Sequence, residues 1–281
     1  MRNAKTAGRR LLIAALGVFA LAAGCASLRS GDWRTASHEP VGSAPDPAKT
    51  HEAVVQVYAA RTFGWRGLFG VHTWVATKPA GAASYTVYEV IGWRARWNDS
   101  VVAIHTRVPD ARWYGATPEL LADKRGEHAE ALIPRIAAAA GSYPWKGEYT
   151  IWPGPNSNTF TAWITRSVPE LQVDLPPTAI GKDYNRNLFD AAPSGGGGQA
   201  SVAGLLAVTA SGVEGLEVNL LGLTFGLNPF DPALKLPLVG RIGPDRILRN
   251  YVLKHQSWSQ SPDIFVPVPV HLQQKAPVIP P

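Results

Sequence analysis

A histidine on one predicted strand and a glutamate on the next are well placed for acid–base chemistry. The run 71–77 alternates apolar with other side chains, so His72 and Trp74 share one face of a strand. If the following turn centres on residues 81–82, Trp74 lies opposite Glu89, and Glu89 becomes a diagonal neighbour of His72. A carboxylate in that position would orient the imidazole as a base.

A serine in a polar segment is the candidate nucleophile. Residues 149–163 place Asn156, Ser157 and Asn158 directly after a Pro-Gly-Pro turn, where a helix could begin. The Ser157 hydroxyl would then face backbone N–H groups at the positive end of the helix dipole. This position suits a helix cap as well as a nucleophile, and the sequence leaves both open. The catalytic candidates are therefore Ser157, His72 and Glu89.

The elements that must position these side chains form an α+β pattern. Four β-like runs, 53–59, 71–77, 85–91 and 101–106, are separated by Gly, Pro, Asn or Asp and predict an antiparallel sheet. A helix is expected to start at residues 117–119, where Thr precedes Pro and Glu. Apolar residues at helical spacing over 129–140 predict a second helical piece, with Pro134 as a kink or break. The prediction is one α+β core over residues 53–190, with helices packed on the sheet.

A Gly-rich β extension is expected over residues 191–260. Four glycines at 195–198 precede two apolar runs, 202–209 and 216–225, which predict two strands or a long hairpin. These runs either complete the core or form a flap that faces a membrane. Residues 261–281 repeat Pro among Val and Ile, a pattern that favours extended backbone. This Pro-rich tail is expected to lie across the domain as a strap or to bind a partner.

The N-terminus predicts export and a lipid anchor. Four basic residues precede the apolar run 11–21, and small residues lead to Cys25. The ending 21–25, Leu-Ala-Ala-Gly-Cys, resembles the lipobox of bacterial lipoproteins, and the alternative is an ordinary signal peptide with a chance Cys. We expect a signal peptide over 1–24, lipidation of Cys25 and a polar tether over 25–52. The expected location is the bacterial cell envelope, at the outer membrane facing the periplasm.

Charge and cysteine content exclude several classes of protein. The net charge of the 281-residue chain is +6, but without the four bases of residues 1–24 it falls to +2, with 23 bases against 21 acids. Nucleic acid is therefore not an expected partner. The single Cys excludes an intrachain disulfide. No set of side chains has metal-ligand spacing, so neither a metal nor a cofactor is predicted.

Several segments together resemble a bacterial family known as domain of unknown function 3750. They are residues 70–74, the strand through Glu89, the helix ending near residues 143–144, the segment 153–160 and the stretch 179–184. The resemblance covers about Val54 to Arg246 and implies no activity. The order of a strand His, a polar residue on the next strand and a helix-opening nucleophile position is remotely similar to circularly permuted NlpC-type papain-like hydrolases and acyltransferases. That similarity implies His72 as base, Glu89 as its orienter and Ser157 where the superfamily normally has Cys.

Two functions follow as alternatives. The first is an envelope lipoprotein without catalysis, a binding or structural module that holds a cell-wall or lipid component in a papain-like groove. This groove would lie between His72 and Ser157, lined by Trp74, Trp93 and Trp152. The second is a serine-dependent amidase, peptidase or acyltransferase that uses Ser157 and His72. Activation of a serine depends wholly on its base, so the distance between Ser157 and His72 separates the two.

Overall fold

An antiparallel sheet of five strands, called here the N-terminal sheet, carries the first half of the chain. The computed structural model describes residues 32–244. The strand order is β4-β3-β2-β1-β5. The strands are β1 (Val54–Arg61), β2 (Val71–Lys78), β3 (Thr86–Val90), β4 (Val102–Thr106) and β5 (Glu119–Arg125). The first four lie where alternation and β-branched residues predicted them.

The register between β2 and β3 agrees with the predicted turn. Val75 pairs with Tyr88, Ala76 with Val87 and Thr77 with Thr86. Continuing this register places Trp74 opposite Glu89, as expected from a turn centred on residues 81–82. The prediction that the strands bearing His72 and Glu89 form an antiparallel hairpin is confirmed.

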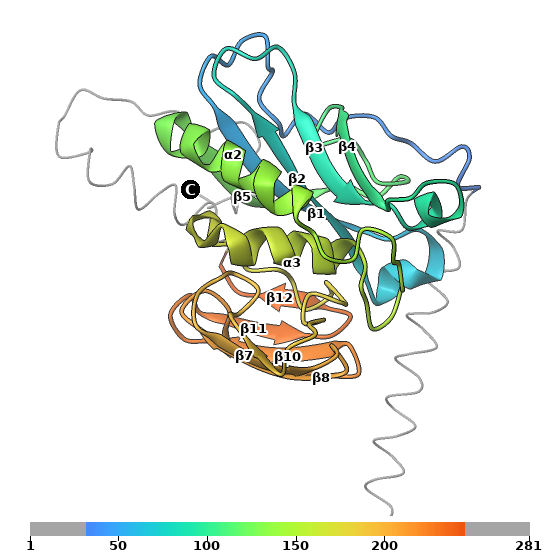
Figure 1. Cartoon of the computed structure of the whole chain (residues 1–281), viewed down its shortest axis with the longest axis vertical. Helices are drawn as coiled ribbons and strands as arrows, with labels where there is room; N and C mark the ends of the chain where they lie inside the picture. Colours follow the sequence, from blue (N-terminus) through green and yellow to red (C-terminus); the bar gives the residue numbers. More distant parts are fainter. Residues whose placement is uncertain (1–31, 245–281) are drawn as a thin grey trace, which may run out of the picture.

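Two helices cover one face of the N-terminal sheet (Figure 1). They are α2 (Gly126–Gly141) and α3 (Ser157–Ser167). The apolar stripe of α2, including Leu132 and Ile136, packs with Phe160 and Ile164 of α3 against Val75 and other strand residues. Short 3-10 helices, η1 (Gly64–Leu68), η2 (Gly92–Arg96) and η3 (Pro169–Leu171), connect these elements. The mixed α+β class is confirmed, although sheet predominates.

The expected helix start at residues 117–119 is wrong, because Glu119–Arg125 forms the edge strand β5. Every residue from Glu119 to Arg125 except Leu121 pairs with a residue of β1. The open edge of β1 therefore decides the conformation of a segment whose Thr-Pro-Glu start favours a helix. Pro134 does not break α2, which runs on to Gly141. Its ring is exposed, and a helix tolerates a lost hydrogen bond best on its solvent side.

A second sheet of seven strands, called here the C-terminal sheet, lies beneath α3 (Figure 1). Its strands are β6 (Phe189–Asp190), β7 (Gly198–Val202), β8 (Leu206–Ser211), β9 (Gly215–Leu220), β10 (Leu223–Asn228), β11 (Ala233–Leu236) and β12 (Gly240–Ile242). Each strand pairs with the next, so the sheet is a simple meander. The runs 202–209 and 216–225 were expected to form two strands or a long hairpin, but each contains a turn, at 203–205 and at 221–222, and the extension is larger than a hairpin. At Gly197, with φ of 76°, an added Cβ would lie 2.3 Å from the carbonyl oxygen of Ala210.

The face of the C-terminal sheet beneath α3 is polar. Lys235 lies 2.5 Å from Asp174 and 2.6 Å from Glu217, and Lys182 lies 2.5 Å from the second oxygen of Glu217. Burial alone would lower the pKa of Lys182, but Asp183 and Glu217 raise it above its ordinary value. Burial raises the pKa of Asp174 to about 6 against the opposing charge of Lys235, and its second carboxylate oxygen has no partner among the described residues. A network of buried charges therefore joins this sheet to the rest of the fold.

Residues 32–52 are tied to the N-terminal sheet and its loops. Pro40 forms a β-bridge with Ala111, the N–H of Ser43 donates to Asp110 over 2.6 Å, and the Tyr85 hydroxyl donates to the carbonyl of Pro45 over 3.0 Å. The expected tether over 25–52 is therefore not free from residue 37 onward, where the carbonyl of Ser37 accepts from the N–H of Gly115 over 2.8 Å.

The signal peptide, Cys25 and the Pro-rich tail over 261–281 lie outside the described residues. Within residues 32–244, no helix has the length and apolar character to cross a membrane.

Candidate functional site

His72 and Glu89 meet on the face of the N-terminal sheet opposite α2 and α3, called here the helix-free face. His72 Nε2 lies 2.7 Å from one carboxylate oxygen of Glu89. The other oxygen lies 2.7 Å from His105 Nε2 and 3.3 Å from Arg107 Nε. These four residues form the histidine cluster, in which one carboxylate accepts three hydrogen bonds.

The electrostatics of the histidine cluster follow from burial of its carboxylate, which is 1% exposed. Burial alone would raise the pKa of Glu89, but hydrogen bonds from His105 and His72 and the charge of Arg107 bring it well below its ordinary value. Burial lowers the pKa of His72, and the contact with Glu89 opposes this only in part. Glu89 is therefore ionised and His72 neutral near pH 7. Because a carboxylate only accepts, the ring proton lies on Nε2 and Nδ1 is the basic nitrogen.

Aromatic rings cover the histidine cluster. Trp113 stacks on His72 with ring centroids 3.7 Å apart and an interplanar angle of 13°. Trp93 is roughly parallel to Trp113 at 6.2 Å, and Tyr114 meets both edge-on. Trp93, Trp113 and Tyr114 form the aromatic cover. Beneath it lies Trp74, which is fully buried.

Two side chains of this region are exposed to a ligand, and a third has a buried donor without a partner. The His105 side chain is 41% exposed, and Trp93 is 46% exposed. Nη2 of Arg107 is buried and has no hydrogen-bond partner among the described residues. An orphaned donor of this kind in a folded protein marks a place for a water or ligand oxygen. Exposed rings of His105 and Trp93 thus lie near an unpaired guanidinium donor just below the surface.

Ser157 lies on the other side of the sheet. It is the first residue of α3, and α3 packs against the face that carries Val71 and Val75. Thr73, which shares that face, donates to Asn158 Oδ1 over 3.0 Å. His72 is the intervening residue of β2, so its side chain points to the helix-free face.

The prediction that Ser157, His72 and Glu89 form one catalytic site is therefore wrong. Among the described residues, Ser157 Oγ makes no hydrogen bond to His72. The expected capping role moves by one residue, because Asn156 is the N-cap and accepts from the N–H groups of Asn158 and Thr159. The three tryptophans of the expected groove separate as well: Trp74 and Trp93 lie with His72, whereas Trp152 donates to the carbonyl of Leu221 beside the C-terminal sheet.

Sequence reasoning missed four members of this site. His105 pairs with Val87 in the β3–β4 register, which places it on the same face as Glu89. Counting alternation along the predicted strand 101–106 would have found it, because the second hairpin follows the same rule as the first. Arg107, Trp113 and Tyr114 lie beyond the strand, in a loop that no local pattern orients.

No group of His, Cys, Asp or Glu able to hold a metal ion occurs between residues 32 and 244. In the histidine cluster, both contacted imidazole nitrogens are turned toward Glu89. The two histidines and Glu89 therefore satisfy one another, and what the arrangement offers is a neutral base, an ionised carboxylate and a stacking surface.

His72 is expected to make stability depend on pH. Its folded pKa is lowered from the ordinary 6.5, so its contribution is complete above about 6.5 and is lost as the pH falls through the folded value. In His72→Gln, the amide keeps a donor toward Glu89 but does not titrate. The free energy of unfolding of the parent should fall more steeply than that of His72→Gln between about pH 7 and 5.

Urea unfolding at several pH values measures this difference. His128→Gln, which changes an exposed histidine on α2, is the control and should follow the parent. Equal slopes for the parent and His72→Gln would show that His72 is not buried in its neutral form.

The described residues form an α+β fold of two antiparallel sheets, with α2 and α3 on one face of the N-terminal sheet and α3 next to the C-terminal sheet. Residues 52–184, which contain the whole histidine cluster, match the model of the family described as Protein of unknown function (DUF3750). No curated protein and no solved structure matched the chain.

Proposed function

We propose that this protein is a lipid-anchored component of the bacterial envelope that binds an acidic carbohydrate on the helix-free face and does not catalyse its conversion. The observation that carries the proposal is the combination of exposed Trp93, half-exposed His105 and the unpaired Arg107 donor around one ionised carboxylate. The ligand belongs to the cell wall or to the sugar headgroup of a lipid.

Carbohydrate is favoured by the aromatic cover. The C–H faces of a sugar ring pack against an indole, and Trp93 presents such a face beside Trp113 and Tyr114. The unpaired donor of Arg107 suits an anionic oxygen, because charge-assisted hydrogen bonds to carboxylate or phosphate are stronger than neutral ones. His105 donates from Nε2 to Glu89, so its Nδ1 is an acceptor for a sugar hydroxyl. Arg107 also balances the charge of Glu89, so the site does not repel an anion through an unpaired carboxylate.

The serine-dependent amidase, peptidase or acyltransferase is the weaker alternative. A serine nucleophile requires a base within hydrogen-bond reach, and Ser157 lies across the sheet from His72. The Ser157 carbonyl accepts from Thr73 Oγ1 over 3.4 Å, which ties the start of α3 to the opposite face. The papain-like similarity would require these side chains on one face.

The envelope location rests on the first 31 residues. The basic stretch, the apolar run 11–21 and the small residues before Cys25 support export followed by acylation of this Cys. Membrane association through Cys25, at the outer membrane facing the periplasm, is therefore part of the proposal. Metabolic labelling with a radioactive fatty acid should mark the parent and leave Cys25→Ser unlabelled.

Calorimetric titration of the full chain tests the binding site. One arm uses a soluble disaccharide-peptide of peptidoglycan, and a second uses a phosphorylated glucosamine disaccharide as a lipid headgroup. Trp93→Ala and His105→Ala should each weaken binding about tenfold, since each removes one main contact. Ser157→Ala should bind like the parent.

Trp97→Ala is the matched control. Trp97 comes directly after η2, the 3-10 helix that contains Trp93, and is 74% exposed. It should not change the affinity. Absence of heat in both arms would contradict the proposal, and turnover that disappears in both Ser157→Ala and His72→Ala would replace it with the hydrolase.

A further inference from the structure

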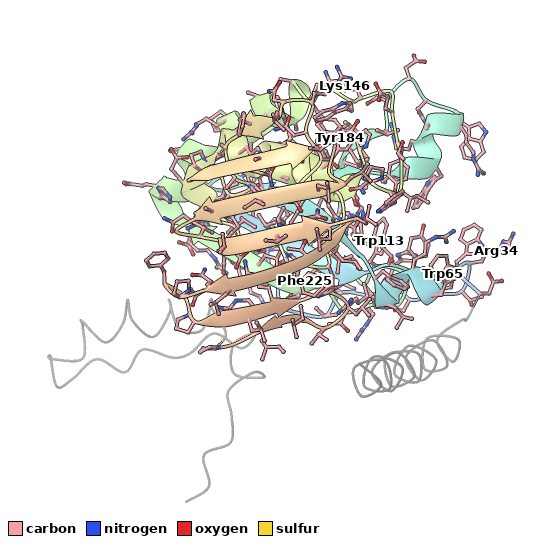
Figure 2. The ribbon with its side chains drawn as sticks, turned by 90° about the horizontal axis from the view of Figure 1, so that it is seen from below. Arg34, Trp65, Trp113, Lys146, Tyr184 and Phe225 are labelled. Carbon is pink, nitrogen blue, oxygen red and sulfur yellow. The ribbon has the colours of Figure 1, made fainter. Side chains whose placement is uncertain are left out.

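The C-terminal sheet has its apolar side turned away from the protein. Along β8, β9 and β10, the outward side chains are Leu206, Val208, Leu216, Val218, Phe225 and Leu227, which are 37–58% exposed. The residues between them, such as Thr209, Glu217 and Asn219, are buried beneath α3. Figure 2 looks onto this outer face, with Phe225 on it and no described helix or strand in front of it. The usual arrangement of apolar-in and polar-out is thus reversed.

This outer face carries no charge. In the register of the described sheet, Lys235 pairs with Arg241, and both point to the buried side with Glu217. The outward positions are aliphatic except for Phe225 and Phe189. Protein interfaces are enriched in aromatic residues, Met and Arg and carry a hydrogen bond about every 100–200 Å². The outward strand positions include two Phe but no Tyr, Trp or Arg, and their side chains offer no hydrogen bond, whereas hydrocarbon requires no hydrogen-bonding partner.

The backbone also suits lipid contact. Strands β7 to β11 each have two hydrogen-bonded neighbours, so their N–H and C=O groups are paired within the sheet. Unpaired backbone groups are what keep most irregular structure out of an apolar medium. The outer face could therefore enter the boundary between headgroups and acyl chains without exposing backbone polar groups.

The short segment between Cys25 and residue 32 would hold the described part of the molecule beside a bilayer. Residue 32, the first described, is only seven residues after Cys25. Seven extended residues reach at most roughly 25 Å. A body held this closely meets the headgroups with one of its faces, and the uncharged outer face has the chemistry for this contact. This step rests on the lipid anchor proposed above.

We infer that the outer face of the C-terminal sheet docks on a lipid bilayer, with its aliphatic side chains in the interfacial region. The helix-free face of the N-terminal sheet, with its histidine cluster, is then left free for a ligand. The alternatives are a second copy of the chain packed face to face and a partner protein.

A site-specific label tests the inference in the full chain. In a Cys25→Ser background, Val218→Cys provides a unique thiol on the outer face, because the parent has one Cys. It is labelled with an environment-sensitive fluorophore and mixed with vesicles of phosphatidylethanolamine and phosphatidylglycerol that contain a nitroxide-labelled lipid. Ala138→Cys, at an exposed position of α2, is the matched control.

The lipid quencher should reduce the emission at position 218 strongly and that at position 138 little. Val208→Thr and Leu227→Thr, added together, make the same face polar while Thr keeps a high strand propensity. They should lower the quenching about tenfold. Weak and equal quenching at both positions would overturn the inference. A blue-shifted label that follows protein concentration without vesicles would overturn it in favour of a second copy.

The two proposals fail separately in this design. If the parent is not acylated but the label at position 218 is quenched, the anchor is wrong and the docking face stands. If the parent is acylated and the label is not quenched, the docking face is wrong.

Discussion

Replacing Glu217 by Ala is expected to lower the free energy of unfolding by about 3–5 kcal/mol. Glu217 is 2% exposed, and its two carboxylate oxygens bind Lys182 and Lys235, which are themselves buried. Removal of the carboxylate leaves two ammonium groups without a shared partner in the interior. The loss should appear as a lower midpoint of denaturant unfolding with little change in slope.

An exposed ion pair provides the control for Glu217→Ala. Arg135 and Glu170 lie 2.6 Å apart, but both side chains are more than 40% exposed. Glu170→Ala should therefore cost only about 0–1 kcal/mol. A similar small loss for Glu217→Ala would mean that water reaches the space between α3 and the C-terminal sheet.

The reversed C-terminal sheet shows where sequence patterns stop being informative. The apolar, Gly-rich runs 202–209 and 216–225 correctly predicted β structure, although each run holds a turn between strands. Within each strand the side chains alternate with period two. The same alternation cannot say which side is buried. Glu217 and Lys235 are buried because each finds an opposite charge 18 residues or more away in sequence, and no local pattern reports such a pairing.

Replacing Glu89 by Ala is the second large effect, with an expected loss of about 3–5 kcal/mol of unfolding free energy. The carboxylate is the shared acceptor for His72, His105 and Arg107. Without it, buried donors lose their partner and the charge of Arg107 loses its nearest counter-ion. Thermal and denaturant unfolding of the parent and the variant give the loss directly.

Glu89→Gln separates charge from shape. The amide keeps one acceptor oxygen and nearly the same volume. The free energy of unfolding of Glu89→Gln should therefore lie between that of the parent and that of Glu89→Ala. Ile104→Ala, at an exposed position of the neighbouring strand β4, should change stability little. If Glu89→Ala is as mild as Ile104→Ala, the histidine cluster does not hold this face together.

The part of the candidate site that depends on strand pairing could be predicted from the sequence. His72 and Glu89 came from one hairpin register, and that register is the one observed. Ser157 was correctly placed at the start of a helix, but a linear pattern does not show which face of the sheet that helix covers. The order of β2, β3 and α3 along the chain fits both arrangements, and the packing of Phe160 and Ile164 against Val75 decides between them.

The central claim is that ligand chemistry belongs to the histidine cluster on the helix-free face and not to Ser157. The most direct measurement is nuclear magnetic resonance of the full chain with ¹⁵N-labelled histidine and backbone, titrated with the peptidoglycan and phosphorylated disaccharide ligands. We expect that the resonances of the ring nitrogens of His72 and His105 shift on binding, that His72 stays neutral with its proton on Nε2, and that the amide resonances of Ser157 and Asn158 do not shift. Shifts confined to Ser157 and Asn158, with both histidines unchanged, would contradict it.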